Sequence, residues 1–129
     1  MTERSSVLDA SSVLALANRE PGADVVGVHL ESSAISTVNW SEIIRRSRDV
    51  DVEIGLLRES LVAADITFWP FIEADAEKAA ALWTATRRLG LSLADRACLA
   101  LAARLGVPAV TADRAWVDLD VGVEVVCIR

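Results

Sequence analysis

Short apolar runs alternate with segments of helical periodicity along the whole chain, and this alternation constrains the fold more than any other feature. Five runs read as strands, at residues 5–9 ("SSVLD"), 33–37 ("SAIST"), 66–70 ("ITFWP"), 107–113 ("VPAVTAD") and 123–129 ("VEVVCIR"). Strands separated by helices form parallel sheets that are covered on both faces. We therefore expect an α/β protein of three layers, with a parallel sheet of about five strands.

The segments between these runs have apolar residues at helical spacing. They predict helices at residues 11–20, 23–31, 38–49, 52–65, 73–90 and 92–106, and a short helical turn at 113–119. Gly90 and Gly106 follow two of them as expected C-terminal stops. The 129 residues contain no repeat, low-complexity segment or linker, so residues 1–129 are expected to form a single domain.

The composition is that of a globular protein, with 53% hydrophobic and 25% charged residues. The apolar runs are too short to span a bilayer, and the first residues lack the apolar stretch of a signal peptide. Cys98 and Cys127 lie in apolar surroundings and read as buried thiols. These features predict a cytoplasmic protein without a membrane segment.

The net charge of −6 by itself argues against a nucleic-acid-binding protein, because phosphate affinity comes mainly from lysine and arginine. The basic residues are nevertheless almost all arginine, a side chain whose planar fork suits phosphate. They are grouped as Arg45, Arg46 and Arg48; Arg87 and Arg88; and Arg96, Arg104 and Arg114. Each group can be a phosphate contact or a solvated helix face.

Four acidic residues lie where the expected strands end or the next helices begin. Asp9 and Asp113 end two strands, Glu42 lies in the helix after the second strand, and Asp95 lies in a first helical turn. Individually they also suit plain roles, because Asp9 and Asp113 can be N-caps, Ser92 and Asp95 have capping-box spacing, and Glu42 can be exposed. Together at the carboxyl edge of a parallel sheet they would repel one another, and crowded carboxylates take up protons or bind hard cations such as Mg²⁺ and Mn²⁺.

Other catalytic schemes lack their residues. His29 is the only histidine, so a two-histidine ribonuclease mechanism is excluded. The sequence contains no phosphate-binding loop, no dinucleotide-binding glycine fingerprint and no G-x-S-x-G nucleophile elbow. Carboxylate chemistry with a divalent cation is what the polar residues support best.

The sequence resembles the PIN domain family, and within it the VapC-type toxins of bacterial toxin–antitoxin pairs. The resemblance rests on four blocks that occur in the family's order: "VLDASSVLAL", "ISTVNWSEI", "GLSLADRACLALAARLGVPAVTADRAW" and "GVEVVCIR". It implies a Mg²⁺- or Mn²⁺-dependent endoribonuclease that forms a homodimer and is inhibited by a cognate antitoxin protein. The family's acidic motif falls on Asp9, Glu42, Asp95 and Asp113, and its accompanying polar residues on Ser11, Asn39 and Thr111.

The resulting hypothesis gives each residue a role. Asp9, Asp95 and Asp113 hold one or two Mg²⁺ or Mn²⁺ ions, assisted by Glu42, and a metal-activated water attacks an RNA phosphodiester. Ser11 and Thr111 orient carboxylates or water, and Arg96 and Arg114 contact the RNA backbone. Some family members use a further acid after the last motif aspartate; Asp118 and Asp120 stand there, and a plain surface role suits both.

Two alternatives remain open at this level. A haloacid-dehalogenase-type phosphatase also begins with an aspartate after its first strand, but it needs a second aspartate where this chain has Ser11. A PIN-like domain can also be a non-catalytic binding scaffold, although all four acids are present here. Assaying RNA cleavage with and without metal would separate the three classes.

The first helix and residues 52–64 carry more apolar side chains than a small sheet needs. They can close the core or form a groove for a partner helix, and the resemblance favours a groove for an amphipathic antitoxin segment. Leu57 is the position that we expect to be exposed there.

Overall fold

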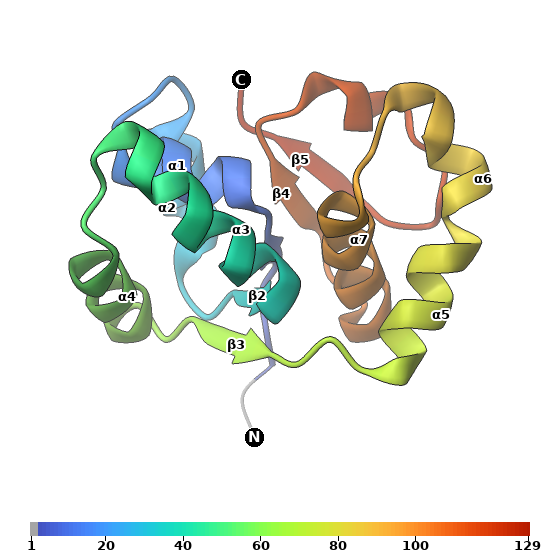
Figure 1. Cartoon of the computed structure of the whole chain (residues 1–129), viewed down its shortest axis with the longest axis horizontal. Coiled ribbons are helices and arrows are strands. Elements are labelled where there is room, and N and C mark those ends of the chain that lie inside the picture. Colours follow the sequence, from blue (N-terminus) through green and yellow to red (C-terminus); the bar gives the residue numbers. More distant parts are fainter. Residues whose placement is uncertain (1–2) are drawn as a thin grey trace.

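The computed structural model describes residues 3–129 and contains a five-stranded sheet in which every neighbouring pair of strands is parallel (Figure 1). Its strands are β1 (Val7–Leu8), β2 (Ala34–Ser36), β3 (Thr67–Trp69), β4 (Ala109–Thr111) and β5 (Val125–Cys127), in the spatial order β3-β2-β1-β4-β5. The α/β fold with a parallel sheet of about five strands, predicted from the alternation, is confirmed.

Helices occupy the segments where helical spacing predicted them. They are α1 (Ala10–Ala17), α2 (Ala23–Leu30), α3 (Thr37–Ser47), α4 (Ile54–Ala63), α5 (Glu73–Ala81), α6 (Trp83–Thr86) and α7 (Leu93–Leu105), with short 3₁₀ turns η1 (Arg48–Val50), η2 (Arg87–Leu89) and η3 (Arg114–Asp118). Within residues 3–129, none of these helices has the length and apolarity needed to cross a bilayer.

One predicted element differs, because the single helix expected at 73–90 is interrupted at Leu82, which separates α5 from α6, and continues from Arg87 as the 3₁₀ turn η2. The Thr86 hydroxyl donates a hydrogen bond to the Leu82 carbonyl at 2.8 Å, a back-bond that bends helices. Both side chains are buried. The bend lets the chain follow the core before it reaches Gly90, which ends η2 with a φ of 71°.

The sheet separates two apolar cores, as alternation along a strand requires. Leu8 packs in a cluster with Val13 of α1 and Leu61 of α4, whereas its neighbour Val7 packs with Leu99 of α7 and Trp116 of η3. In Figure 1, α1, α2 and α4 lie on one side of the sheet and α5, α6 and α7 on the other. The three predicted layers follow from this division.

The strand order reverses at β1, which lies at the centre of the sheet between β2 and β4. The chain builds outward from β1 through β2 to β3, then crosses to β4 and β5 on the other side. In such sheets ligands bind outside the carboxyl ends of the strands at the reversal point. Asp9 follows β1 and Asp113 lies just beyond β4, and α3 packs against both α1 and α7 close to them.

The prediction that Leu57 of α4 is exposed is wrong. Leu57 is only 8% exposed, whereas its neighbour Leu56 is 64% exposed. Leu57 and Leu61 are four residues apart and form the buried stripe of α4, and both belong to the core. The exposed large apolar residues of this helix are therefore Leu56 and Val62, which is 50% exposed.

Candidate active site

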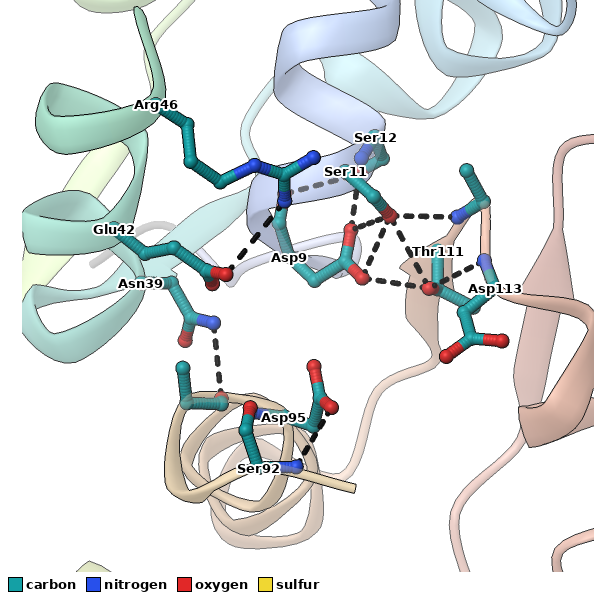
Figure 2. A network of polar contacts seen from close by, with 12 residues as sticks. Asp9, Ser11, Ser12, Asn39, Glu42, Arg46, Ser92, Asp95, Thr111 and Asp113 are labelled. Atoms are coloured by element: carbon teal, nitrogen blue, oxygen red, sulfur yellow. Dashed lines mark hydrogen bonds and ion pairs between the residues drawn. The ribbon is translucent and has the colours of Figure 1, made fainter. Parts of the chain in front are cut away.

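Four carboxylates from four different elements face a common space at the carboxyl end of the sheet (Figure 2). Asp9 follows β1, Glu42 lies in α3, Asp95 lies in the first turn of α7, and Asp113 lies just beyond β4. Asp9 is only 4% exposed, while Glu42 and Asp95 are half-buried and Asp113 is exposed. The structure thus gathers all four acids that the sequence singled out, although they are as many as 104 positions apart in the chain.

Neutral donors hold the Asp9 carboxylate in place. The Thr111 hydroxyl donates to Oδ2 at 2.6 Å, the Ser12 backbone N–H donates to Oδ1 at 2.8 Å, and the Ser11 hydroxyl lies 2.8 Å from Oδ1. The Ser12 contact makes Asp9 the N-cap of α1. A carboxylate offers about four lone-pair positions, so these three donors leave room for a further ligand.

The same two hydroxyls tie the ends of β1 and β4 together. Ser11 Oγ accepts a hydrogen bond from the Ala112 backbone N–H at 2.8 Å, and Thr111 Oγ1 accepts one from the Asp113 backbone N–H at 3.0 Å. Ser11 and Thr111 therefore position both the Asp9 carboxylate and the segment that carries Asp113. The sequence hypothesis placed them beside the acids in this supporting role.

Asp95 and Asp113 also cap helical segments, which was their plain interpretation. Asp95 and Ser92 form a capping box, in which the Ser92 backbone N–H donates to Asp95 Oδ2 at 2.9 Å. Asp113 Oδ1 accepts from the Ala115 backbone N–H at 3.0 Å and begins η3. Among the described residues, the other oxygen of each carboxylate has no hydrogen bond in the structure. Capping and metal binding are thus compatible at both positions.

Burial makes this group of acids electrostatically costly. Burial raises the pKa of Asp9 to about 6, against the opposing effect of its hydrogen-bond donors. Burial also raises the pKa of Asp95, and the nearby Asp113 carboxylate adds to that rise. The pKa of the buried Cys98 thiol is raised first by burial and further by the charges of Asp9, Asp95 and Glu42. The carboxylates therefore lie close enough for their negative charges to act on neighbouring groups, and a bound cation would reduce the repulsion.

Asn39 contributes an unused acceptor to the same region. Its side chain is fully buried in α3, and its Nδ2 donates to the Ala94 carbonyl at 3.0 Å, linking α3 to the start of α7. Its Oδ1 is buried without a hydrogen-bond partner among the residues that the structure describes. Figure 2 shows the Asn39 amide between Glu42 and Asp95. A buried acceptor of this kind usually has a bound water or ligand as its partner.

The donor set fits a hydrated divalent cation. Carboxylate and amide oxygens are the ligands that Mg²⁺ and Mn²⁺ prefer. In residues 3–129, no three histidine, cysteine, aspartate or glutamate side chains are close enough to form a ready-made metal cage. An ion such as Mg²⁺ keeps several of its own waters and needs few direct protein ligands, so its site does not have to be a closed cage of side chains.

Two arginines were predicted to contact the RNA backbone, and both make hydrogen bonds within the protein. Arg96 Nη1 donates to the Ala79 carbonyl of α5 at 2.9 Å, so its guanidinium is engaged on the other side of α7. Arg114 is exposed, and its Nη1 donates to the Arg129 carbonyl at 3.1 Å. Asp118 and Asp120 are both exposed, as their surface interpretation expects. The roles proposed for these four residues stay predictions.

Sequence reasoning missed Arg46 as a member of the site. Arg46 Nη1 lies 3.6 Å from Glu42 Oε2, one turn along α3, and Figure 2 shows its guanidinium beside the acids. The signal was present, because Glu42 and Arg46 have the i, i+4 spacing that pairs opposite charges on a helix.

Comparisons with known proteins match the chain to one family model and match its fold to solved structures. The family model described as PIN domain matches residues 6–122. The fold is similar to a toxin–antitoxin complex from Klebsiella pneumoniae, with a TM-score of 0.72, 19% identity, and 97% of this chain and 98% of that chain covered. It is also similar to DNA-bound VapBC from Salmonella typhimurium, with a TM-score of 0.70, 14% identity, and coverage of 98% and 99%. No curated protein sequence matches the chain.

Proposed function

The chain belongs to the PIN domain family, and we propose that it is a divalent-metal-dependent endoribonuclease, the toxin of a toxin–antitoxin pair. One observation carries the enzymatic proposal. Asp9, Glu42, Asp95 and Asp113 face a common space where the strand order of the sheet reverses, and the pKa of the buried Asp9 is raised to about 6. Perturbed carboxylates at such a position indicate a functional site.

The residues of the acidic centre have different roles in the proposed reaction. Asp9, Asp95 and Asp113 hold Mg²⁺ or Mn²⁺, and Glu42 assists directly or through water. A divalent ion bound there supplies Lewis acidity and an activated water for in-line attack on phosphorus. Ser11 and Thr111 fix the orientation of Asp9, as their hydrogen bonds to its carboxylate support. Asn39 Oδ1 accepts a hydrogen bond from a water in the centre.

Cleavage assays on structured and unstructured RNA test this proposal. The metal-free protein should be inactive, and Mg²⁺ or Mn²⁺ should restore cleavage, because without the ion no water is activated and nothing offsets the repulsion between the carboxylates and the phosphate. The products should carry 5′-phosphate and 3′-hydroxyl ends, since water rather than the ribose 2′-oxygen attacks. Full activity in a chelator-treated sample would refute the metal centre, and cyclic phosphate ends would refute attack by water.

The same assays separate the alternatives. A non-catalytic PIN scaffold would bind RNA without cleaving it at any metal concentration. The phosphatase alternative has lost its basis, because the chain belongs to another family and the position that would need a second aspartate holds Ser11, whose hydroxyl hydrogen-bonds to Asp9.

An apolar hollow supports the proposal of an antitoxin partner. It has a volume of ≈ 520 Å³ and lies between the end of α1, the end of α2 and α4. Its apolar lining residues include Leu16, Leu30, Val52, Leu56 and Leu61. The similar folds from Klebsiella pneumoniae and Salmonella typhimurium are of proteins in toxin–antitoxin complexes. We place the amphipathic antitoxin segment in this hollow, and we expect the toxin itself to be a homodimer.

Leu56→Glu tests the antitoxin site. Leu56 is 64% exposed at the hollow, so a charge there should weaken antitoxin binding by roughly tenfold or more, as loss of an apolar anchor does, while RNA cleavage survives. Leu89→Glu is the matched control, because Leu89 is an exposed leucine of η2 on the other face of the sheet.

Calorimetric titration of the antitoxin and inhibition of cleavage provide the two measurements. Equal affinities of Leu56→Glu and Leu89→Glu would place the antitoxin elsewhere. Leu57→Glu is unsuitable for this test, because Leu57 belongs to the core and the variant is expected to unfold.

A further inference from the structure

One arginine lies at the edge of the carboxylates of the proposed metal centre. Arg46 Nη1 is 3.6 Å from Glu42 Oε2, and their side chains are 39% and 24% exposed. The guanidinium also acts on Asp95, whose pKa is raised mainly by burial and lowered by Arg46 among other groups. Figure 2 shows the Arg46 side chain extending from α3 and the ion pair between its guanidinium and Glu42. It therefore supplies positive charge where a divalent cation would bind.

The neighbouring arginine of α3, Arg45, does not share this position. Arg45 is exposed and lines a hollow on the outer side of α3 together with Trp40 and Arg48. Successive helical residues point about 100° apart, whereas residues four apart share a face. Glu42 and Arg46 thus face the acidic centre while Arg45 faces away from it, although Arg45 and Arg46 carry the same charge.

The ion pair of Glu42 and Arg46 is of a kind that can open. Its 3.6 Å separation is longer than a good charge-assisted hydrogen bond, and a partly exposed i, i+4 pair contributes little to stability. A divalent cation attracts Glu42 with twice the charge of a guanidinium. Glu42 can therefore exchange Arg46 for metal without a large cost to the fold.

We propose that Arg46 competes with the divalent cation for Glu42 and thereby sets how tightly the acidic centre binds metal. The inference rests on the metal centre proposed above and adds an internal competitor to it. Arg46 is a positioning residue in this scheme. In the metal-free protein it offsets part of the carboxylate repulsion, and in the metal-bound protein it releases Glu42.

Titration of the metal-free protein with Mn²⁺ tests the competition without reference to catalysis. Arg46→Gln should bind Mn²⁺ about tenfold more tightly than the wild type, because a unit charge a few ångströms from the ion is removed. Arg45→Gln is the matched control, since it makes the same change in net charge on the preceding residue of α3, and it should change the affinity less than about twofold. Calorimetry gives the affinities, and circular dichroism confirms that each variant is folded.

A double-mutant cycle attributes the effect to the ion pair. Glu42→Gln should weaken Mn²⁺ binding, and adding Arg46→Gln to it should recover much less affinity than Arg46→Gln gains in the wild type. Equal gains in both backgrounds would show a general effect of charge and would overturn the competition.

The outcomes keep the two proposals apart. Wild-type binding with equal affinities for Arg46→Gln and Arg45→Gln would overturn the role of Arg46 and leave the metal centre intact. If neither the wild type nor Arg46→Gln binds Mn²⁺, both proposals fail. Binding by Arg46→Gln alone would support the competition in its strongest form.

Discussion

Two buried aspartates in this molecule have opposite surroundings. Asp75 of α5 is 2% exposed and accepts two hydrogen bonds from Arg104 of α7, from Nε at 2.8 Å and from Nη2 at 2.9 Å. Asp9 is 4% exposed and receives hydrogen bonds only from hydroxyl groups and a backbone N–H. One buried carboxylate thus has a cation of its own, and the other has none.

The difference separates a structural carboxylate from a functional one. A bidentate guanidinium satisfies Asp75 and joins α5 to α7, and Arg104 also lies 5.4 Å from the centre of the Trp69 ring. Asp9 instead stays close to other acids, so its charge is compensated only when a cation arrives. Burial of an acid therefore says little about function until its counter-charge has been identified.

Replacing Asp9 with asparagine should impair RNA cleavage, whereas replacing Asp75 should impair stability. The loss of cleavage in Asp9→Asn is the strongest effect that we expect. Asp9→Asn should reduce RNA cleavage by more than about a hundredfold, because losing a metal ligand should cost at least as much as losing a residue that supports one. Asp75→Asn should leave cleavage near the wild-type rate but lower the free energy of unfolding by roughly 2 kcal/mol, a value below that of a fully buried pair because the Arg104 side chain is 28% exposed.

Cleavage rates and urea denaturation of both variants provide the measurements. Asp95→Asn is expected to behave as Asp9→Asn does. Wild-type cleavage by Asp9→Asn would refute the site, and loss of cleavage in folded Asp75→Asn would refute the distinction between the two aspartates.

The missing counter-charge at Asp9 should also make the stability of the protein depend on pH. The pKa of Asp9 is raised from 3.8 to about 6 in the folded protein, so the folded state holds this proton more tightly than the unfolded state. Asp9 therefore favours folding below about pH 4, and this contribution is lost as the pH rises through 6. The loss amounts to at most roughly 3 kcal/mol at neutral pH.

In the presence of a chelator, the free energy of unfolding of the wild type should fall between about pH 4 and pH 7 relative to that of Asp9→Asn. Urea denaturation across this range measures the difference, and Mn²⁺ added at neutral pH should stabilise the wild type more than the variant. If the free energies of unfolding of the two proteins change in parallel with pH, the charged Asp9 carboxylate does not destabilise the folded state.

The smallest expected effect concerns the neutral donors that replace a counter-charge at Asp9. Thr111→Val removes the hydroxyl that donates to Asp9 Oδ2 and accepts from the Asp113 backbone N–H. Mn²⁺ affinity should fall by about tenfold, as is usual for residues that orient a metal ligand. Thr84→Val, at an exposed position of α6, serves as the control in calorimetry, and equal affinities of the two variants would deny Thr111 this role.

Much of the fold and the positions of the acids followed from the sequence. The alternation of short apolar runs with helical patterns predicted every strand and the parallel sheet, because these patterns reflect burial on two faces. Asp9 and Asp113 could be placed at strand ends from their neighbours alone. Ser92 and Asp95 could be recognised as a capping box from their spacing, which the structure confirms.

Packing between distant segments decided the rest. The sequence could not show that Arg104 hydrogen-bonds to Asp75 or that Arg96 hydrogen-bonds to Ala79 instead of facing the acidic centre. It also could not show that Leu56 rather than Leu57 is exposed. These outcomes depend on which helix faces which, and local periodicity leaves the rotation of a helix uncertain by about one residue.

The strands and helices, their order along the chain, and the positions of Asp9 and Asp113 after strands could be read from the amino-acid sequence, because hydrogen bonding and burial within short segments decide them. Which charged side chains lie next to one another depends on how distant segments pack in the tertiary structure. This packing left Asp9 buried without a cation, gave Asp75 its arginine 29 residues away, and set Arg46 against Glu42 at the edge of the acidic centre. The pairing of charges depends on distances across the fold, and it is this pairing that separates a carboxylate that stabilises the fold from one that awaits a metal ion.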